Sequence, residues 1–384
     1  MPGLTKAAAL AAALGSQAFA QRTKFTLTHP DLANFTVYDD SFYDVIGASA
    51  SIELLYNATE PLFHEGAVYV AAADTLFVSS NRIPLPDGQT DDSTSNQMIK
   101  LSAVTNVSAP MTQGGGPGSP ITVQPVDTSS IVLPNGGVLN TGPRGEQNGI
   151  IFTAQGSKTK PGGLFSIPDP VGNPNVSVPL VTSFMGRPFN SLNDVAVLSE
   201  IDGETFWFTD PSYGASQGIR DPPQLPNQVY RFDTATNTTR VVADGFQQPN
   251  GLAFSLDFNV LYVTDGSASS DNPAGTATIY KYDLAYNQPG TFLANRTVFA
   301  FAPEGIPDGI KVDQKGNVWC GTGSGVSVFN NIGELIGEIT VKGGASNFGS
   351  ATFGAFNGER TIFVLGETLL WRVKLWIETG VASS

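Results

Sequence analysis

Short apolar runs that alternate with polar residues recur along almost the whole chain, and clusters of Gly, Asn, Asp and Pro separate them. This alternation has the period of two that places every second side chain of a β-strand on the same face. After the N-terminal segment, no long stretch keeps the 3.6-residue period of an amphipathic helix. The pattern therefore predicts an all-β protein built from many short strands joined by tight turns.

One sequence motif recurs at regular spacing within this pattern. An Asn or Asp opens an apolar run, and the following run closes on an aromatic residue and a Thr or Gly; the openings are Asn193, Asn250 and Asp308. Their separation is about that of one blade of a β-propeller plus an insertion. We therefore predict one six-bladed β-propeller over residues 21–384, in which residues 24–60 either supply a closing strand or cover one mouth. The expected blades lie roughly at 64–107, 120–168, 190–243, 248–302, 306–342 and 345–376.

Radial repetition brings the residues that open the innermost strands together around a central channel. Glu65 opens the first blade in the same way, so four oxygen-bearing side chains converge: Glu65, Asn193, Asn250 and Asp308. Two carboxylates and two amide carbonyls suit calcium, which takes about six to eight oxygen ligands, whereas a chain with only two histidines offers little to zinc or copper. Asn-Gly and Asp-Gly are also ordinary turn signals. Four such positions in register, each opening a blade, favour a metal-binding channel.

The N-terminus has the pattern of a secretory signal peptide over residues 1–20. Lys6 supplies the positive charge, residues 7–14 are apolar, and Ala18-Phe19-Ala20 is a small-x-small cleavage site. The alternative is a helical N-terminal arm. Six Asn-x-Ser/Thr sequons support a secreted, extracellular glycoprotein; they begin at Asn34, Asn57, Asn106, Asn175, Asn237 and Asn295.

Charge and cysteine content exclude several classes of function. The formal net charge of −14 argues against nucleic-acid binding, because neutralising phosphates needs a basic face. No stretch after the leader is long and apolar enough to span a membrane. The single cysteine, Cys320, cannot form an intrachain disulfide and lies in a buried-strand pattern, so we expect it to be a small core residue.

Four segments taken together resemble the motifs of the gluconolactonase and regucalcin-like (senescence marker protein) family: His64–Tyr69, Arg187–Asp194, Pro249–Phe254 and Pro307–Val312. The resemblance covers residues 60–375, and the chain is similar to the secreted fungal lactonohydrolases of that family. It implies a six-bladed propeller with one divalent cation, often calcium, in the central channel. It also implies that Glu65, Asn193, Asn250 and Asp308 line the metal site.

The same resemblance assigns roles in the hydrolysis of a lactone to a hydroxy acid. The cation would polarise the lactone carbonyl, and Asp308 would activate a water or attack directly. Asn193 would take part in catalysis and would contact substrate more than metal. Arg187 and Asn190 are expected to bind substrate, although Arg187 has the alternative of pairing with a surface carboxylate. Behind the ligands, we expect His64 to support the site and Asp194 either to orient Asn193 or to cap its strand.

We therefore expect a secreted, monomeric, calcium-dependent lactonase that acts on a small-molecule lactone. One rival is a phosphotriesterase-type hydrolase on the same metal, and a strictosidine-synthase-like condensation is weaker. A rival of another class is a non-catalytic propeller that binds a carbohydrate or protein ligand and whose cation is structural. A histidine-dyad mechanism is excluded because only His29 and His64 are present, and a serine-hydrolase mechanism lacks its Gly-x-Ser-x-Gly elbow.

Overall fold

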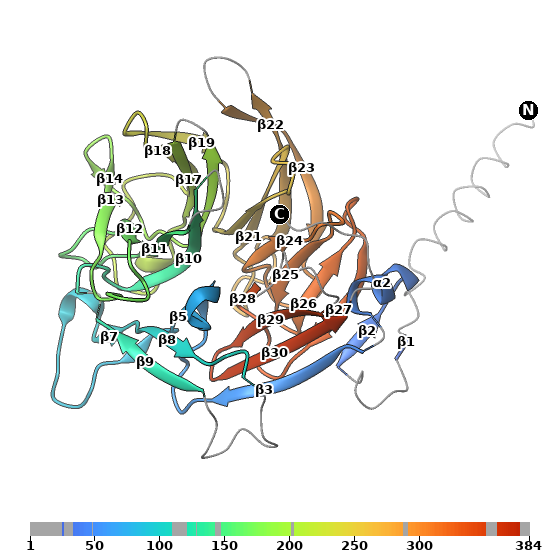
Figure 1. The fold of residues 1–384 in the computed structure, drawn as a ribbon. Helices are drawn as coiled ribbons and strands as arrows, with labels where there is room; N and C mark the ends of the chain where they lie inside the picture. Colours follow the sequence, from blue (N-terminus) through green and yellow to red (C-terminus); the bar gives the residue numbers. More distant parts are fainter. Residues whose placement is uncertain are drawn as a thin grey trace, which may run out of the picture.

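A computed structural model shows six four-stranded antiparallel units arranged around a central axis (Figure 1). It describes residues 25–26, 34–47, 49–109, 121–127, 129–142, 147–200, 203–286, 291–350 and 359–376. Helix within these residues is confined to two single turns, α2 (Tyr43–Ile46) and α3 (Tyr213–Ser216), and the 3-10 turns η2 (Asp40–Phe42), η3 (Ala71–Ala73) and η4 (Asp92–Thr94). The predicted all-β, six-bladed propeller is confirmed. The expected signal peptide, residues 1–20, lies outside the described residues.

Each blade is a meander whose first strand lies innermost. The first three blades comprise β4 (Glu65–Val70), β5 (Thr75–Ser79), β8 (Leu101–Thr105) and β9 (Thr122–Val126); β10 (Pro134–Thr141), β11 (Gln147–Ala154), β12 (Gly163–Ile167) and β13 (Val178–Val181); and β16 (Val195–Glu200), β17 (Gly203–Asp210), β18 (Gln228–Asp233) and β19 (Thr238–Ala243). Two hairpins lie between these strands: β6 (Ile83–Pro84) with β7 (Gln97–Met98), and β14 (Ser183–Phe184) with β15 (Arg187–Pro188).

The other three blades complete the circle. They comprise β20 (Pro249–Phe254), β21 (Val260–Gly266), β22 (Ala277–Tyr286) and β23 (Thr291–Phe301); β24 (Ile310–Val312), β25 (Val318–Thr322), β26 (Gly325–Phe329) and β27 (Leu335–Thr340); and β28 (Asn347–Ser350), β29 (Glu359–Gly366) and β30 (Leu369–Trp376). The expected second blade, 120–168, differs from this layout, because β9 is the outer strand of the first blade. Strand β9 is largely exposed, so its sequence shows no core-facing alternation that would assign it to one blade or the other.

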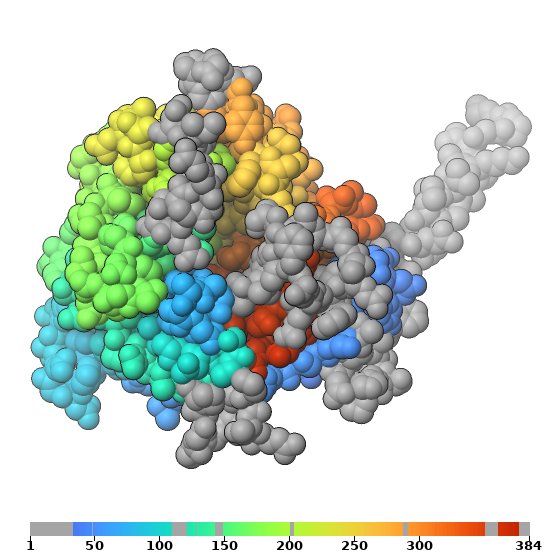
Figure 2. Space-filling view, in the orientation of Figure 1, coloured from blue at the N-terminus to red at the C-terminus, as the bar shows by residue number. Residues whose placement is uncertain are grey.

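The N-terminal part of the domain closes the circle. Strand β3 (Ser51–Asn57) pairs with β30 as the outer strand of the sixth blade, and β2 (Phe35–Val37), flanked by β1 (Phe25–Thr26), extends the fifth blade beside β27. In Figure 2 the blue and red segments accordingly lie side by side. Of the two roles open to residues 24–60, the closing strand is the one observed. This pairing joins the N-terminal part of the domain to its last blade, so segments far apart in the chain close the ring.

The hydrophobic core lies between neighbouring blades as well as within them. Clusters of buried aromatic and aliphatic side chains join each sheet to the next, as where Phe363 and Leu365 of β29 pack with Leu76 and Val78 of β5. Cys320 belongs to such a cluster and is fully buried, as expected for a core residue. This packing fixes the blades around the axis and so positions the residues that open the innermost strands.

Candidate metal centre

Six side chains, one from each blade, open the innermost strands at one end of the channel. They are Glu65, Asn135, Asn193, Asn250, Asp308 and Asn347, and all carry oxygen. Contacts between β4 and β10, β10 and β16, β16 and β20, β20 and β24, and β28 and β4 hold these strands in a ring. The gap between the fifth and sixth blades is closed by the Gly309 amide, which donates to the carbonyl of Ser346 (2.8 Å).

Several oxygens in this ring are buried without a hydrogen-bond partner. The Oδ1 atoms of Asn193, Asn250 and Asp308 accept no hydrogen bond, and neither does Oδ1 of Asn135. Buried polar atoms are nearly always satisfied in native proteins, and leaving one unpaired costs about 1–3 kcal/mol. Several unpaired acceptors gathered at one end of the channel fit a site that binds a cation.

The carboxyl groups of the ring interact strongly. Asp308 lies within hydrogen-bonding reach of Glu65 and of the Asn250 side chain. Burial, together with the charges of Asp308 and Asp194, raises the pKa of Glu65 well above its ordinary value. Burial likewise raises the pKa of Asp308 to about 6, although the nearby His64 and the hydrogen bond with Glu65 oppose this. The centre thus concentrates negative charge in a poorly solvated place.

A series of hydroxyl groups fixes the backbone of the ring residues. At the end of the second strand of each of four successive blades, a hydroxyl donates to the carbonyl of the ring residue of the next blade. The pairs are Ser79 to Asn135 (2.8 Å), Thr153 to Asn193 (2.7 Å), Thr209 to Asn250 (2.6 Å) and Thr264 to Asp308 (3.0 Å). Neighbouring blades are thereby held in register at the level of the centre.

Thr209 and Thr264 are each followed by an aspartate, and each aspartate orders the chain that leads to the ring residue of its own blade. Asp210 accepts hydrogen bonds from the backbone amides of Asn190 (3.0 Å) and Ser191 (2.9 Å). Asp265 accepts in the same way from Gln247 (3.1 Å) and Gln248 (2.7 Å). In each Thr-Asp dipeptide, the threonine therefore holds the ring residue of the next blade, and the aspartate holds the chain before the ring residue of its own blade.

Asp194 and His64 each neighbour a ring residue in the chain and make polar contacts outside the ring. Asp194 Oδ1 accepts from the amide of Val195 (2.8 Å) and Oδ2 from the amide of Leu252 in the next blade (3.4 Å), so it both caps its strand and joins two blades. His64 Nδ1 lies 2.8 Å from Glu367 Oε1. Although burial opposes the charged ring, the hydrogen bond and charge of Glu367 raise the pKa of His64.

Arg187 and Asn190 lie away from the ring oxygens. Arg187 is exposed on the β14–β15 hairpin, and no contact with a ring residue is seen for it within the described parts of the chain. Asn190 is buried, and its amide donates to the carbonyl of Leu225 (3.1 Å).

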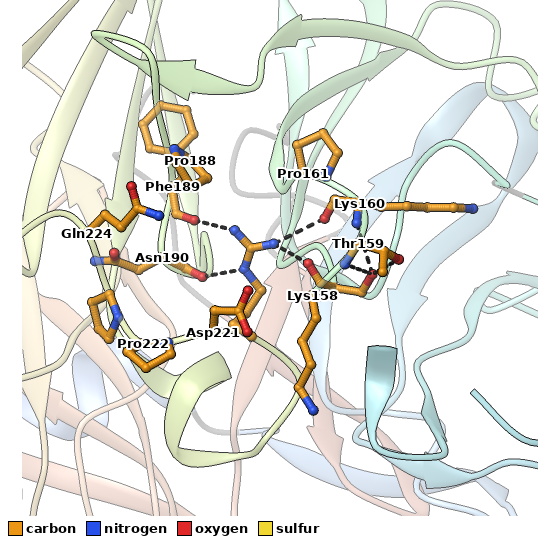
Figure 3. A pocket seen from close by; sticks show the side chains of 13 residues that line it. Lys158, Thr159, Lys160, Pro161, Pro188, Phe189, Asn190, Asp221, Pro222 and Gln224 are labelled. Atoms are coloured by element: carbon orange, nitrogen blue, oxygen red, sulfur yellow. Dashed lines mark hydrogen bonds between the residues drawn. The ribbon is translucent and has the colours of Figure 1, made fainter. Parts of the chain in front are cut away.

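Asn190 also lines a pocket of about 190 Å³ at the rim of the propeller. There Arg220 donates to the carbonyls of Phe189 (2.6 Å), Asn190 (2.9 Å) and Lys160 (3.1 Å), which Figure 3 shows converging on one guanidinium. This guanidinium is occupied in joining two loops, and none of the six ring residues lines the pocket.

The wall around the ring end of the channel is uneven. The loops between second and third strands rise from this end and are long in the first four blades, at residues 80–100, 155–162, 211–227 and 267–276. In the fifth and sixth blades they shrink to Gly323–Ser324 and Glu367–Thr368. The first and third loops meet where Ser95 donates to the carbonyl of Gly218 (2.6 Å). The low side of the wall therefore lies over the fifth and sixth blades.

Tyr213, from the third loop, lies next to the ring. Its hydroxyl donates to the carbonyl of Gly266 (2.6 Å) and is within hydrogen-bonding reach of the Asn250 side chain. Burial and the charge of Asp308 raise its pKa, which keeps the hydroxyl protonated.

Asn135, Asn347 and Tyr213 were not expected from the sequence. For Asn135 a signal exists, because Pro134-Asn135-Gly136 repeats Pro249-Asn250-Gly251. Asn347 carries no such motif, and Tyr213 lies in a loop whose path only the fold determines. In the described part of the chain, no group of three or more His, Cys, Asp or Glu side chains is placed to hold a metal. A cation in this centre would instead rely on amide oxygens alongside two carboxylates.

Outside the ring, the structure bears on the glycosylation sequons and on membrane-spanning helices. The six sequon asparagines, Asn34, Asn57, Asn106, Asn175, Asn237 and Asn295, all have exposed side chains. Across the described ranges, no helix is long and apolar enough to cross a membrane.

Comparison with known proteins identifies relatives of this chain. A 194-residue segment is 32% identical to the lactonohydrolase oryL of Aspergillus oryzae, covering 46% of this chain and 42% of that protein, so it spans less than half of that relative. A gluconolactonase of Zymomonas mobilis is 26% identical over 328 residues, which are 84% of this chain and 81% of the relative. The solved gluconolactonase XC5397 of Xanthomonas campestris is similar with a TM-score of 0.64 and 25% identity, covering 88% of this chain and 93% of that one.

A family model described as "SMP-30/Gluconolactonase/LRE-like region" matches residues 133–365. This range includes the ring residues from Asn135 to Asn347, and Glu65 precedes it. Because the match extends over more than half of the chain and agrees with the fold, the protein belongs to the SMP-30/gluconolactonase/LRE-like family.

Proposed function

We propose that this protein is a secreted lactonase that hydrolyses the ester bond of a small lactone with the help of one divalent cation at the propeller axis. The observation that carries the proposal is the set of unpaired oxygens of Asn193, Asn250 and Asp308 beside the carboxyl group of Glu65. Relatives named lactonohydrolase and gluconolactonase support the reaction class.

Glu65, Asn193, Asn250 and Asp308 are the residues that would hold the cation. All of their donor atoms are oxygen, which favours a hard ion such as calcium over zinc or copper. Once bound, the cation would act as a Lewis acid on the lactone carbonyl and balance the charge of the two carboxylates.

Asp308 would act on the proton of the attacking water. It is half-buried and has one oxygen that accepts no hydrogen bond. As a general base it would take a proton from a water held beside the lactone; as a nucleophile the same oxygen would attack the carbonyl carbon. Although burial raises the pKa of this carboxyl group, the neighbouring Asn250 side chain lowers it and so favours the charged form. Asn193, the neighbouring amide in the ring, would contact both the cation and the substrate.

The walls favour access to the centre over the fifth and sixth blades, where the loops are shortest. Tyr213 stands on the opposite, high side beside Asn250 and would limit how far a substrate extends there. Arg187 is exposed on a hairpin, and a role in binding would require a substrate that reaches the outer wall.

The extracellular location belongs to the same proposal. The exposed position of all six sequon asparagines suits N-glycosylation. For protein secreted from a eukaryotic host, treatment with an N-glycosidase is expected to lower the mass, and sequencing of the mature N-terminus to begin at Gln21.

The decisive experiment is a panel of lactones assayed by acid release, with added calcium and after chelation. We expect calcium-dependent hydrolysis of at least one aldonolactone or other small lactone. Asp308→Asn should keep the fold and lower turnover by about 100-fold or more, the range of a lost general base. A panel without turnover would exclude the proposal, and hydrolysis of phosphotriesters alone would replace it with the rival hydrolase. Calcium binding in the absence of any turnover would indicate a ligand-binding propeller.

A further inference from the structure

The ring contains an asparagine that the four expected ligands do not include. Asn135 opens β10, the innermost strand of the second blade, and so occupies the place that Asn193 and Asn250 occupy in the next two blades. Asn135 and Asn250 are each the middle residue of a Pro-Asn-Gly tripeptide. Local sequence and blade position are therefore shared with an expected ligand.

The backbone of Asn135 is held by the same device as those ligands. The Ser79 hydroxyl donates to the carbonyl of Asn135 (2.8 Å), just as Thr209 donates to that of Asn250 (2.6 Å). Ser79 is also the strand partner of Glu65, and the amide of Gly136 donates to the carbonyl of Asn193 (2.8 Å). Asn135 thus lies between Glu65 and Asn193 in the ring.

The side chain of Asn135 is buried, with 7% exposure, and its Oδ1 accepts no hydrogen bond. Asn347, the other unexpected member of the ring, differs in this respect. Its Nδ2 donates to Glu65 (2.6 Å) and its Oδ1 accepts from the amide of Phe348 (2.7 Å), so its side chain already has partners and supports Glu65. A buried, unpaired oxygen at the axis thus distinguishes Asn135 from Asn347.

We infer that Asn135 is a further oxygen ligand of the divalent cation, between Glu65 and Asn193. This inference rests on the proposed cation centre. Calcium takes about six to eight oxygens, and a fifth protein oxygen leaves fewer positions to water and substrate. Asn135 lies in the second blade, beneath the high side of the wall, so an oxygen from this residue would leave the low side over the fifth and sixth blades free for substrate.

The test measures calcium affinity by titration calorimetry on chelator-treated protein. Asn135→Leu replaces the amide by a side chain of similar shape without an oxygen, and we expect calcium affinity to fall by at least about tenfold, a loss typical even of groups that only support a ligand. Asn135→Ser keeps a polar side chain, but its oxygen lies nearer the backbone and farther from the axis. It should show a similar loss of calcium affinity, and it replaces the leucine variant in the test if that variant does not fold. The gain in thermal midpoint on adding calcium should shrink in both variants.

Asn140→Leu is the matched control. Asn140 is in the same strand, is equally buried and also has an unpaired Oδ1, but it lies toward the other end of β10, roughly 15 Å from Asn135. Its substitution should leave calcium affinity unchanged. If the Asn135 variants bind calcium like the unaltered protein, the inference is wrong while the proposed centre stands. If the unaltered protein binds no calcium, the proposed centre itself fails.

Discussion

The ring residues owe their positions to neighbours in the preceding blade. Thr209 shows how: its hydroxyl donates to the carbonyl of Asn250 (2.6 Å) and accepts from the amide of Asp194 (3.1 Å). A valine in β17 would satisfy the strand pattern equally well. The requirement for a hydroxyl therefore comes from its two partners, Asp194 of the same blade and Asn250 of the next blade.

Thr209→Val is expected to lower the free energy of unfolding by about 1–3 kcal/mol, because a buried amide and a buried carbonyl lose their partner. It should also weaken calcium binding, since the backbone of Asn250 is no longer held. Thr205→Val is the control, because Thr205 is a buried residue of the same strand whose hydroxyl donates to Leu198 (3.2 Å), away from the ring. That variant should lose stability alone, and Thr209→Ser should restore both properties. Equal calcium affinities in the two valine variants would contradict a positioning role for Thr209.

Among the elements, the turns between the outer two strands of a blade depend on local polar contacts. In β18, Asp233 pairs with Arg231 (3.0 Å) and accepts from the amide of Thr236 in the following turn (3.1 Å). Although partial burial opposes the charge, these hydrogen bonds and the charge of Arg231 lower the pKa of Asp233. A lowered pKa means that the charged carboxylate contributes stability above its unfolded-state value, near 3.9.

That contribution should be lost as pH falls through the lowered, folded-state pKa. We expect Asp233→Asn to lower the free energy of unfolding by about 1 kcal/mol at pH 7, and the difference from the unaltered protein to shrink once pH falls below about 4. Denaturant unfolding at several pH values measures both. A difference that stays constant from pH 7 to pH 3 would show that the charge of Asp233 adds nothing.

For the whole molecule, closure of the ring depends on contacts between distant parts of the chain. Arg372, buried in β30, binds Glu53 of β3 through Nε (3.1 Å) and donates to the carbonyls of Val107 (2.9 Å) and Ala109 (2.8 Å) after the first blade's β8. One guanidinium thus joins the last blade, its N-terminal closing strand and the first blade.

Arg372→Met should lower the free energy of unfolding by about 3–5 kcal/mol, because it leaves a partly buried carboxylate and two carbonyls without their partner. Glu53→Gln, which keeps an acceptor for the guanidinium, should cost less. Arg82→Met, at an exposed arginine of the first blade whose contact with Gln97 is long (3.4 Å), is the control and should change little. Similar losses in all three variants would contradict a closing role for Arg372.

Binding of a cation at the propeller axis would affect the stability of the whole molecule. A cation that binds only the folded state adds about 2.7 kcal/mol when its concentration is 100 times its dissociation constant. Chelation should therefore lower the thermal midpoint of the unaltered protein and abolish lactone hydrolysis. A variant that combines Glu65→Gln with Asp308→Asn should not respond. An unchanged midpoint in the unaltered protein would exclude a tightly bound ion.

The sequence by itself determined the strands, the six-bladed repeat and four of the six ring residues. Strand alternation and blade spacing are periodic along the chain. The repeat therefore identifies Asn193, Asn250 and Asp308 from the sequence alone. Only the tertiary structure decided that β3 closes the sixth blade, that Asn347 completes the ring, and that Arg187 lies on the β14–β15 hairpin. Each of these depends on how segments far apart in the chain align, because loops of very different lengths separate the strands and hide the register in which the blades meet.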